Sequence, residues 1–348
     1  MKYSMKKILM FAATFFAAFT ISQNVLFAQT KNDQTFKSLM SKADQVIVSA
    51  NAVTFTDDSD RTEALTIQKR PKTVAVLYSS HSTLWIECGG KVSIGLGGKS
   101  ATELYREQIG RDITQDADFI KVSDGANPST WDIESILFAK PDLIICTKTM
   151  NGYKTIAGPA AQMNIPVIAV DYDGVQDYLK WSRVFTAINA REDLYKKIPL
   201  KTAQKVAAII DKVPNKKVRV LALLPTAKAI KADTTHTNLG AMLEDLKAVN
   251  AVTESFSDLN ASRVEINIEQ IYKANPDIIL FPVEQNDSFV AKYFEKQLSS
   301  NPIWSELKAV KSGSVYFLPK KLFLFRPNRG YADAYKMLAE LLYPRTKF

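Results

Sequence analysis

Aromatic and basic side chains alternate close to the C-terminal end of the chain. Residues 319–331 read PKKLFLFRPNRGY and contain Lys320, Lys321, Phe323, Phe325, Arg326, Arg329 and Tyr331. Aromatic rings stack against flat groups, and guanidinium and ammonium groups form strong charge-assisted hydrogen bonds with anions. The segment therefore suits a flat anionic ligand. The alternative is a structural segment whose bases are solvated and whose phenylalanines belong to the core.

Only two histidines are present, which disfavours a site built mainly from imidazole ligands. His236 lies in the polar run TTHTN (234–238) ahead of an apolar stretch, where capping of a helix is the simpler interpretation. His81 follows a predicted strand. Either histidine is an alternative ligand for iron carried by a bound molecule. Direct capture of zinc or manganese would need about three histidines and a carboxylate, so it is the weaker alternative.

Sequence motifs of catalysis are missing. The run GLGGKS (95–100) is similar to a phosphate-binding loop, but the first glycine of that motif would fall at Ser93. No G-x-S-x-G, H-E-x-x-H or C-x-x-C motif occurs. We therefore expect a binding protein and not an enzyme. An exported hydrolase that uses scattered carboxylates is the alternative.

The composition is that of a folded protein of about two domains. The chain has 348 residues, of which 46% are hydrophobic and 23% charged, and this excludes extensive disorder. Lysine and arginine (45) exceed aspartate and glutamate (36), but the net charge of +9 is spread along the chain without a basic block. A nucleic-acid partner is therefore not expected.

The first 28 residues have the pattern of a signal peptide. Lysines at positions 2, 6 and 7 precede the apolar run 8–21, and the small residue Ala28 precedes a polar stretch. The run is shorter than the roughly 20 residues that span a bilayer. We expect cleavage near Ala28, export to a periplasm and no membrane span in the mature chain. No cysteine follows the run, so no lipid anchor is expected.

Two cysteines fall in apolar surroundings. Cys88 lies near the end of a predicted helix, and Cys146 lies on a predicted strand. Buried free thiols are the favoured interpretation, with a disulfide as the alternative in an oxidising compartment.

Short buried strands that alternate with helices must position these side chains. The predicted strands are 73–78, 142–146 and 166–170 in the first half of the chain, and 217–224, 277–281 and 314–318 in the second. Continuous apolar runs bounded by breakers are typical of strands buried on both faces of a parallel sheet. Strands spaced by helices indicate an α/β fold, here in two lobes with mainly parallel central sheets.

A repeat relates the two lobes. Residues 133–145 (IESILFAKPDLII) and 268–280 (IEQIYKANPDIIL) align at a constant offset of 135 positions (268 minus 133). Each predicts a helix that stops at a proline and is followed directly by a buried strand. Glu134 and Glu269 fall in the first turns of these helices, where a carboxylate gains about 0.3–1 kcal/mol from the helix dipole.

Apolar residues recur at helical spacing among many charges over residues 174–214. We interpret this segment as a helical linker between an N-terminal lobe (29–173) and a C-terminal lobe (215–348). Such a linker is stiffer than a hinge rich in glycine and serine, and it limits how far the lobes can open.

Loops at one edge of each sheet are the predicted ligand site. Ligands of open α/β sheets bind outside the carboxyl ends of the strands, so the loops there would face a cleft between the lobes. The candidate ligand-binding residues are Tyr78, His81, Trp85, Trp131, Tyr153, Tyr172, Lys228, Phe325, Arg326 and Arg329. We expect Trp85 and Trp131 close enough to the cleft to report binding by fluorescence.

Taken together, several segments resemble the substrate-binding proteins of ABC importers, in the class whose lobes are joined by a helical backbone. The resemblance covers about residues 53–345. It rests on VTFTDD (53–58), RPKTVAVL (70–77), the repeated glutamate and Pro-Asp motifs, and NPIWSELKAV (301–310) followed by Val315 and Tyr316. The class serves ferric siderophores, haem and cobalamin, so the resemblance implies transport without naming the cargo.

The resemblance also implies partners. In this class one glutamate on each lobe docks into an arginine pocket of a two-fold permease, which implies that role for Glu134 and Glu269. The expected partners are a permease dimer with its ATPase subunits and one small ligand, which is an iron chelate, haem or a corrinoid. We expect a monomer with no metal site and no cofactor of its own, although the ligand can contain iron or cobalt.

Overall fold

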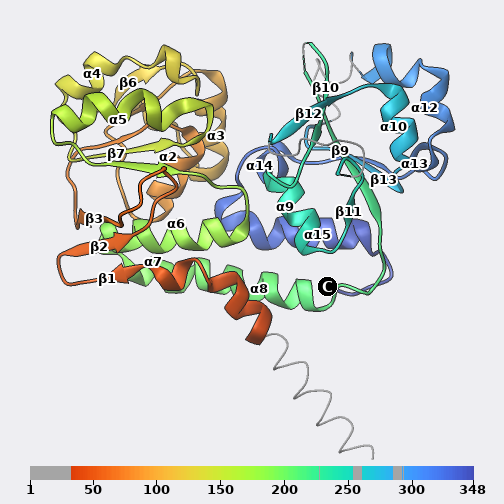
Figure 1. The fold of residues 1–348 in the computed structure, drawn as a ribbon, viewed down its shortest axis with the longest axis horizontal. Helices are drawn as coiled ribbons and strands as arrows, with labels where there is room; N and C mark the ends of the chain where they lie inside the picture. Colours follow the sequence, from red (N-terminus) through yellow and green to blue (C-terminus); the bar gives the residue numbers. More distant parts are fainter. Residues whose placement is uncertain (1–32, 227, 254–260, 285–291, 293) are drawn as a thin grey trace, which may run out of the picture.

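Two lobes stand side by side over a layer of long helices in the computed structural model (Figure 1). The structure describes residues 33–226, 228–253, 261–284, 292 and 294–348, and the predicted signal peptide (1–28) lies outside this part. The described chain begins with a helix over residues 33–40 and a small antiparallel sheet. This sheet consists of β1 (Ile47–Val48), β2 (Ala52–Phe55) and β3 (Leu65–Gln68). The prediction of an α/β fold in two lobes is confirmed.

A five-stranded parallel sheet forms the centre of the N-terminal lobe. In the order β6-β5-β4-β7-β8, its strands are β6 (Ile120–Ser123), β5 (Ile94–Leu96), β4 (Val74–Val76), β7 (Leu143–Thr147) and β8 (Val167–Val170). The strands β4, β7 and β8 coincide with predicted strands, and all of their residues are buried. The strands β5 and β6 were not predicted, because a glycine interrupts the apolar run of β5 and β6 has polar and exposed residues.

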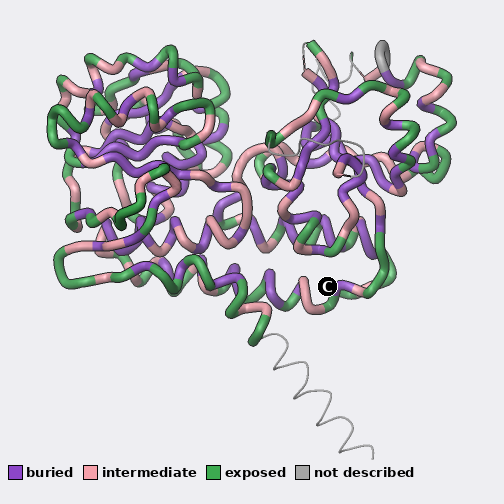
Figure 2. The backbone as a smooth tube through the Cα atoms, viewed as in Figure 1, coloured by how far each residue is buried: buried purple, intermediate pink, exposed green. Residues whose placement is uncertain are grey.

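Helices cover both faces of this sheet. They are α2 (Ser79–Glu87), α3 (Lys99–Ile109), α4 (Ile133–Phe138) and α5 (Gly152–Gln162). Because successive side chains of a strand point to opposite faces, neighbouring residues of β7 enter two different cores. Ile144 packs among residues of α4 and α5, and Ile145 packs among residues of α2 and α3. The sheet is therefore the buried middle layer of the lobe (Figure 2).

A mixed sheet forms the centre of the C-terminal lobe. In the order β12-β10-β9-β13-β14, its strands are β12 (Arg263–Ile266), β10 (Ile230–Asp233), β9 (Arg219–Pro225), β13 (Ile278–Phe281) and β14 (Val315–Phe317), and β11 (Val249–Asn250) also pairs with β9. The parallel strands β9, β13 and β14 coincide with predicted strands. The strands β10 and β12 are antiparallel additions that the sequence pattern did not reveal. A connection as short as the one from β9 to β10 joins only antiparallel strands.

The helices of this lobe are short. They are α9 (Asn238–Asp245), α10 (Ile268–Ala274), α12 (Pro302–Glu306), α13 (Lys308–Lys311) and α14 (Lys320–Phe323). Thr237 begins α9 as a cap, because its side chain accepts a hydrogen bond from the backbone N–H of Gly240 at 3.0 Å. A side chain at Gly240 would collide with the carbonyl oxygen of Thr234, so only glycine allows this tight entry.

A layer of helices lies beneath the two sheets (Figure 1). They are α6 (Val175–Ile188), α7 (Glu192–Lys197), α8 (Pro199–Asp211) and the C-terminal α15 (Tyr331–Leu342), which packs against α8. Ten of the 14 residues of α6 are buried, so this helix is enclosed on most sides. None of the helices in the described part of the chain has the length and apolarity needed to cross a membrane. The predicted linker interval holds α6 to α8, while the lobe boundaries at 173 and 214 stay a prediction.

Both cysteines are free and buried. The Cys88 thiol points to the carbonyl oxygen of Ser182, and the Cys146 thiol points to that of Ile168. Burial raises the pKa of both thiols, so neither is a reactive thiolate at neutral pH. The favoured interpretation of two buried thiols is confirmed.

Candidate functional site

A cavity of about 300 Å³ lies where the two lobes meet. The N-terminal lobe contributes Tyr78, at the carboxyl end of β4, and Asp173, which follows β8. The C-terminal lobe contributes His236, Thr237, Asn238, Ser262, Arg263, Leu324, Phe325 and Arg326. Of the cavities described here it is the one whose lining comes from both lobes, and it lies at the strand ends where a ligand is expected.

Arg326 crosses from the C-terminal lobe and contacts three groups of the N-terminal lobe. Its Nε donates to the carbonyl oxygen of Tyr172 at 2.6 Å, and its Nη2 lies 3.2 Å from Oδ1 of Asp173. Its Nη1 lies 3.3 Å from Oη of Tyr78, and the guanidinium carbon is 5.7 Å from the centre of that ring. Burial raises the pKa of Asp173 to about 6, although Arg326 opposes this rise.

A second arginine of the cavity is held within the C-terminal lobe. Nε of Arg263, on β12, donates to Oδ1 of Asp233 at 2.6 Å. Thr237 donates to the other oxygen of that carboxylate at 3.1 Å. Burial raises the pKa of Asp233, and its contact with Arg263 favours the ionised form. The pair orients Arg263 beside the cavity.

Three predicted ligand residues line the cavity together, namely Tyr78, Phe325 and Arg326. His236, in the loop before α9, also lines the cavity, and its side chain is exposed. Lys228 is exposed in the turn between β9 and β10 and is not part of the lining. These residues converge because β4, β8 and the loops of the second lobe end at the same interface.

Two predicted residues lie behind the cavity surface. His81 is 1% exposed, its ring lies 4.8 Å from that of Tyr78, and neither ring nitrogen has a hydrogen-bond partner. Burial and the nearby Arg326 lower the pKa of His81, so its imidazole is neutral. Tyr172 is 1% exposed and donates to Oδ1 of Asn328 at 3.1 Å. Both rings support Tyr78 and Arg326 and do not present a face to the cavity.

The prediction that Trp85 lies at the cleft is wrong. Its indole is 0% exposed, packs edge-on against Phe185 of α6, and donates from Nε1 to the carbonyl oxygen of Lys91 at 3.0 Å. Trp85 occupies the face of α2 that covers the sheet, so it belongs to the core of the lobe.

Trp131 and Tyr153 share the apolar cluster on the α4 and α5 side of the N-terminal sheet and lie outside the cavity lining. Trp131 is 6% exposed and packs in the same apolar cluster as Tyr153. The Tyr153 hydroxyl accepts a hydrogen bond from Nη2 of Arg61 at 3.1 Å. The structure gives both rings contacts within their own lobe.

Arg329 forms an ion pair instead of lining the cavity. Its Nε donates to Oε1 of Glu87 at 3.0 Å, and its Nη2 donates to the carbonyl oxygen of Gln108 at 2.8 Å. Asn328 beside it is fully buried and donates to Oγ1 of Thr83 at 2.9 Å. Arg329 therefore lies outside the cavity lining, and this part of the loop ties the second lobe to α2 and α3.

Sequence reasoning missed several lining residues. Ser262 and Arg263 lie at the start of β12, a strand that was not predicted. Thr237 and Asn238 belong to the run that was expected to cap a helix. Thr237 is the cap of α9, Asn238 is the first residue of that helix, and both line the cavity. Asp173 was not among the predicted ligand residues. Its position directly after a buried strand was the signal that could have identified it.

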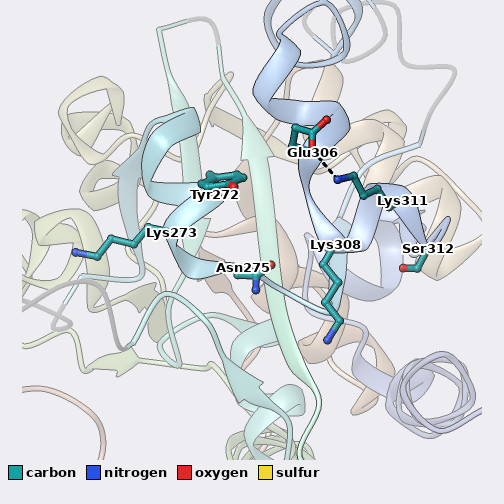
Figure 3. A pocket seen from close by; sticks show the side chains of 7 residues that line it. All are labelled: Tyr272, Lys273, Asn275, Glu306, Lys308, Lys311 and Ser312. Carbon is teal, nitrogen blue, oxygen red and sulfur yellow. Dashed lines mark hydrogen bonds and ion pairs between the residues drawn. The ribbon is translucent and has the colours of Figure 1, made fainter.

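Two cavities that are more than twice as large lie elsewhere, each within one lobe. One of about 1020 Å³ is lined by residues 66–72, 140–142 and 162–166. The other, of about 720 Å³, lies between α10 and α13, where Lys311 bonds to Glu306 and Lys273 points away from the other side chains (Figure 3). Lys308 in this cavity is paired with Asp277. Neither cavity is shared between the lobes, so size alone does not mark the ligand site.

Glu134 and Glu269 are exposed in the first turns of α4 and α10, one on each lobe (Figure 1). Asp132 caps α4 by accepting from the backbone N–H of Ser135 at 3.0 Å, and Asn267 caps α10 in the same way. Neither cap uses the glutamate of its helix, and both glutamate side chains are exposed to solvent. Among the residues that the structure describes, no group of three or more His, Cys, Asp and Glu side chains is arranged to hold a metal ion.

The ion pair of Glu87 predicts a pH dependence of stability. Burial raises the pKa of Glu87 from 4.5 to about 7, although Arg329 opposes the rise. The folded state therefore holds more protons than the unfolded chain between these values. The stability that neutral Glu87 contributes is present below pH 4.5 and is lost as the pH rises through 7. Asp173 and Asp245, whose pKa values burial also raises to about 6, act in the same direction.

We expect the free energy of unfolding to fall between pH 5 and pH 8. In the variant Glu87→Gln this fall should be smaller by roughly 1–3 kcal/mol, because the titrating group is gone. Urea denaturation at four pH values measures the slope. The control is Glu63→Gln, which changes an exposed glutamate and should keep the wild-type slope of the free energy of unfolding against pH. An unchanged slope in Glu87→Gln would assign the pH dependence to other groups.

Comparison with known proteins adds to this geometry. A family model described as periplasmic binding protein matches residues 74–322. The Fe(3+)-citrate-binding protein YfmC of Bacillus subtilis is 26% identical over 255 residues, which are 72% of this chain and 74% of the relative.

Solved structures share the fold. A periplasmic binding protein from Veillonella parvula has a TM-score of 0.65 at 18% identity, covering 86% of this chain and 94% of its own. IsdE of S. aureus complexed with heme has a TM-score of 0.61 at 19% identity, and the match covers 79% of this chain and 99% of the IsdE chain.

Proposed function

The chain belongs to the family of periplasmic binding proteins, the substrate-binding components of ABC importers, and from this premise we propose that its inter-lobe cavity captures an anionic iron complex. The observation that carries the proposal is the pair Arg263 and Arg326, which come from separate segments and line one cavity. Guanidinium groups that are already oriented bind carboxylate or catecholate oxygens strongly. Tyr78 and Phe325 add ring surface for the chelator.

The size of the cavity favours a compact chelate. Its volume of about 300 Å³ lies at the lower end of the roughly 300–1,000 Å³ of small-molecule pockets. A ferric complex of citrate or a small catecholate suits this volume better than haem or a corrinoid. The name of the B. subtilis relative, which refers to Fe(3+)-citrate, supports the same ligand class.

The role of the protein is capture and delivery, without a chemical step. The family implies a permease and ATPase partner. Glu134 and Glu269 would dock the loaded protein onto the two permease subunits, one glutamate to each. The basic and apolar order of residues 1–28 supports export to the periplasm, where the chain would act as a monomer.

Isothermal titration calorimetry tests the ligand. Ferric citrate, a ferric catecholate, haem and cyanocobalamin are titrated at pH 7 into the chain without its first 28 residues, and iron-free citrate is the control. We expect one of the two anionic ferric chelates to bind at least about tenfold more tightly than cyanocobalamin, a difference of about 1.4 kcal/mol. Preference for cyanocobalamin, or no binding by either chelate, would contradict the proposal.

A further inference from the structure

Among the described residues that line the inter-lobe cavity, Asp173 carries the one carboxylate. Its Oδ1 lies 3.2 Å from Nη2 of Arg326. Arg326 does not depend on this contact for its position, because its Nε donates to the carbonyl oxygen of Tyr172 at 2.6 Å. Asp173 can therefore leave the guanidinium while the guanidinium stays in the cavity.

We propose that Asp173 is an internal competitor of the ligand: an anionic ligand replaces Asp173 on Arg326, and Asp173 takes up a proton from solvent. The inference rests on the anionic ligand proposed above. A carboxylate that loses its counter-charge to an arriving anion has a less stable ionised form. Binding of the ligand and binding of one proton are then coupled, so each favours the other.

The surroundings of Asp173 make this proton uptake easy near neutral pH. Burial, together with the carboxylates of Asp171 and Asp177, raises the pKa of Asp173 to about 6. Arg326 and His236, from the opposite lobe, lower the pKa. The remaining charged and titratable side chains of the cavity are Arg263, which is paired with Asp233, and Tyr78. Arg326 is thus the main group that keeps Asp173 ionised, and a bound anionic ligand would pair with Arg326 in place of Asp173.

Calorimetry with ferric citrate in two buffers of different ionisation enthalpy measures the proton. At pH 7 we expect the wild-type protein to take up close to one proton per ligand. Its affinity should rise by up to about tenfold per pH unit from pH 8 to pH 6. The variant Asp173→Asn should lose this uptake and bind ferric citrate at least about tenfold more tightly at pH 8, because the competing charge is gone. Any proton exchange by the chelate itself would persist in the variant and is subtracted.

Two further variants separate the alternatives. Glu87 also pairs with an arginine of the other lobe, Arg329, but outside the cavity. The variant Glu87→Gln removes that carboxylate and should keep the proton uptake. Histidine side chains also titrate near neutral pH, so His236→Gln is needed, and it should keep the uptake as well. Loss of the uptake in His236→Gln would assign the proton to His236 and overturn the inference.

The pH dependence of the wild-type protein tests the inference without any variant. Binding of ferric citrate with equal heats in both buffers and no pH dependence would overturn the inference and leave the proposed function intact. Absence of binding by ferric citrate, the ferric catecholate and haem would contradict both.

Discussion

Reversing the charge of Glu134 and Glu269 is expected to stop transport while leaving ligand affinity unchanged. Each glutamate is exposed in the first turn of a helix, α4 or α10, on a different lobe. A lysine there meets the positive end of the helix dipole, which costs a few tenths to about 1 kcal/mol of stability. If each glutamate meets basic groups of the permease, the reversal also replaces attraction by repulsion and costs several kcal/mol at the interface.

Uptake of iron-loaded ligand into vesicles that carry the permease and its ATPase measures this effect. The single variants Glu134→Lys and Glu269→Lys should each slow uptake, and the double variant should slow it more, because two subunits are engaged. Calorimetry should give wild-type affinity for every variant, since neither glutamate lines the cavity. Glu63→Lys places the same charge change on an exposed loop of the N-terminal lobe and should leave uptake normal.

One result would contradict the docking role. A double variant that folds, binds its ligand and still drives normal uptake would leave Glu134 and Glu269 as helix-terminus charges. The loss of stability would then be the whole effect, and denaturation with urea would show it.

The sequence predicted those parts of the fold that depend on continuous burial. The strands β7 and β8 are buried along their whole length, so their apolar runs stand out from the neighbouring helices. The strands β10 (IKAD) and β12 (RVEI) have four residues each, and charged residues interrupt both, so neither gives a continuous apolar run. The cavity depends on β12, because this strand carries Arg263, and that residue was missed for the same reason.

The roles of single residues depended on contacts between distant segments. Arg326 and Arg329 are three positions apart and look equivalent in the sequence. Their partners are Asp173, 153 positions away, and Glu87, 242 positions away, and only the folded chain brings them close. Trp85 shows the same limit. Its place shortly after a strand end suggested the cleft, but the rotation of α2 turns its indole toward the core.

Replacing the two cavity arginines should have the largest effect on affinity. Arg263→Gln and Arg326→Gln each remove a charged donor from an anionic ligand. Hydrogen bonds to charged groups contribute about 1.5–3 kcal/mol, so each variant should bind at least tenfold more weakly. The double variant should lose at least a hundredfold. Titration calorimetry with the chelate that binds the wild-type protein measures both.

Stability must be followed in the same variants, because both arginines also have structural contacts. Arg263→Gln leaves the buried carboxylate of Asp233 without its counter-charge, and Arg326→Gln removes contacts between the lobes. Both should lower the melting temperature. The affinities are therefore compared at a temperature well below the melting point of the weakest variant, where every protein is folded.

Arg329→Gln is the matched control, since it removes the same charge from the same loop. Arg329 bonds to Glu87 and to the carbonyl oxygen of Gln108, outside the cavity lining. The variant should lose stability, because Glu87 keeps its burial and loses its partner, but it should bind the chelate within about threefold of wild type. Equal losses of affinity in Arg326→Gln and Arg329→Gln would mean that the loop acts on binding through the lobe interface as a whole. Wild-type affinity in the double variant of Arg263 and Arg326 would place the anion elsewhere on the protein.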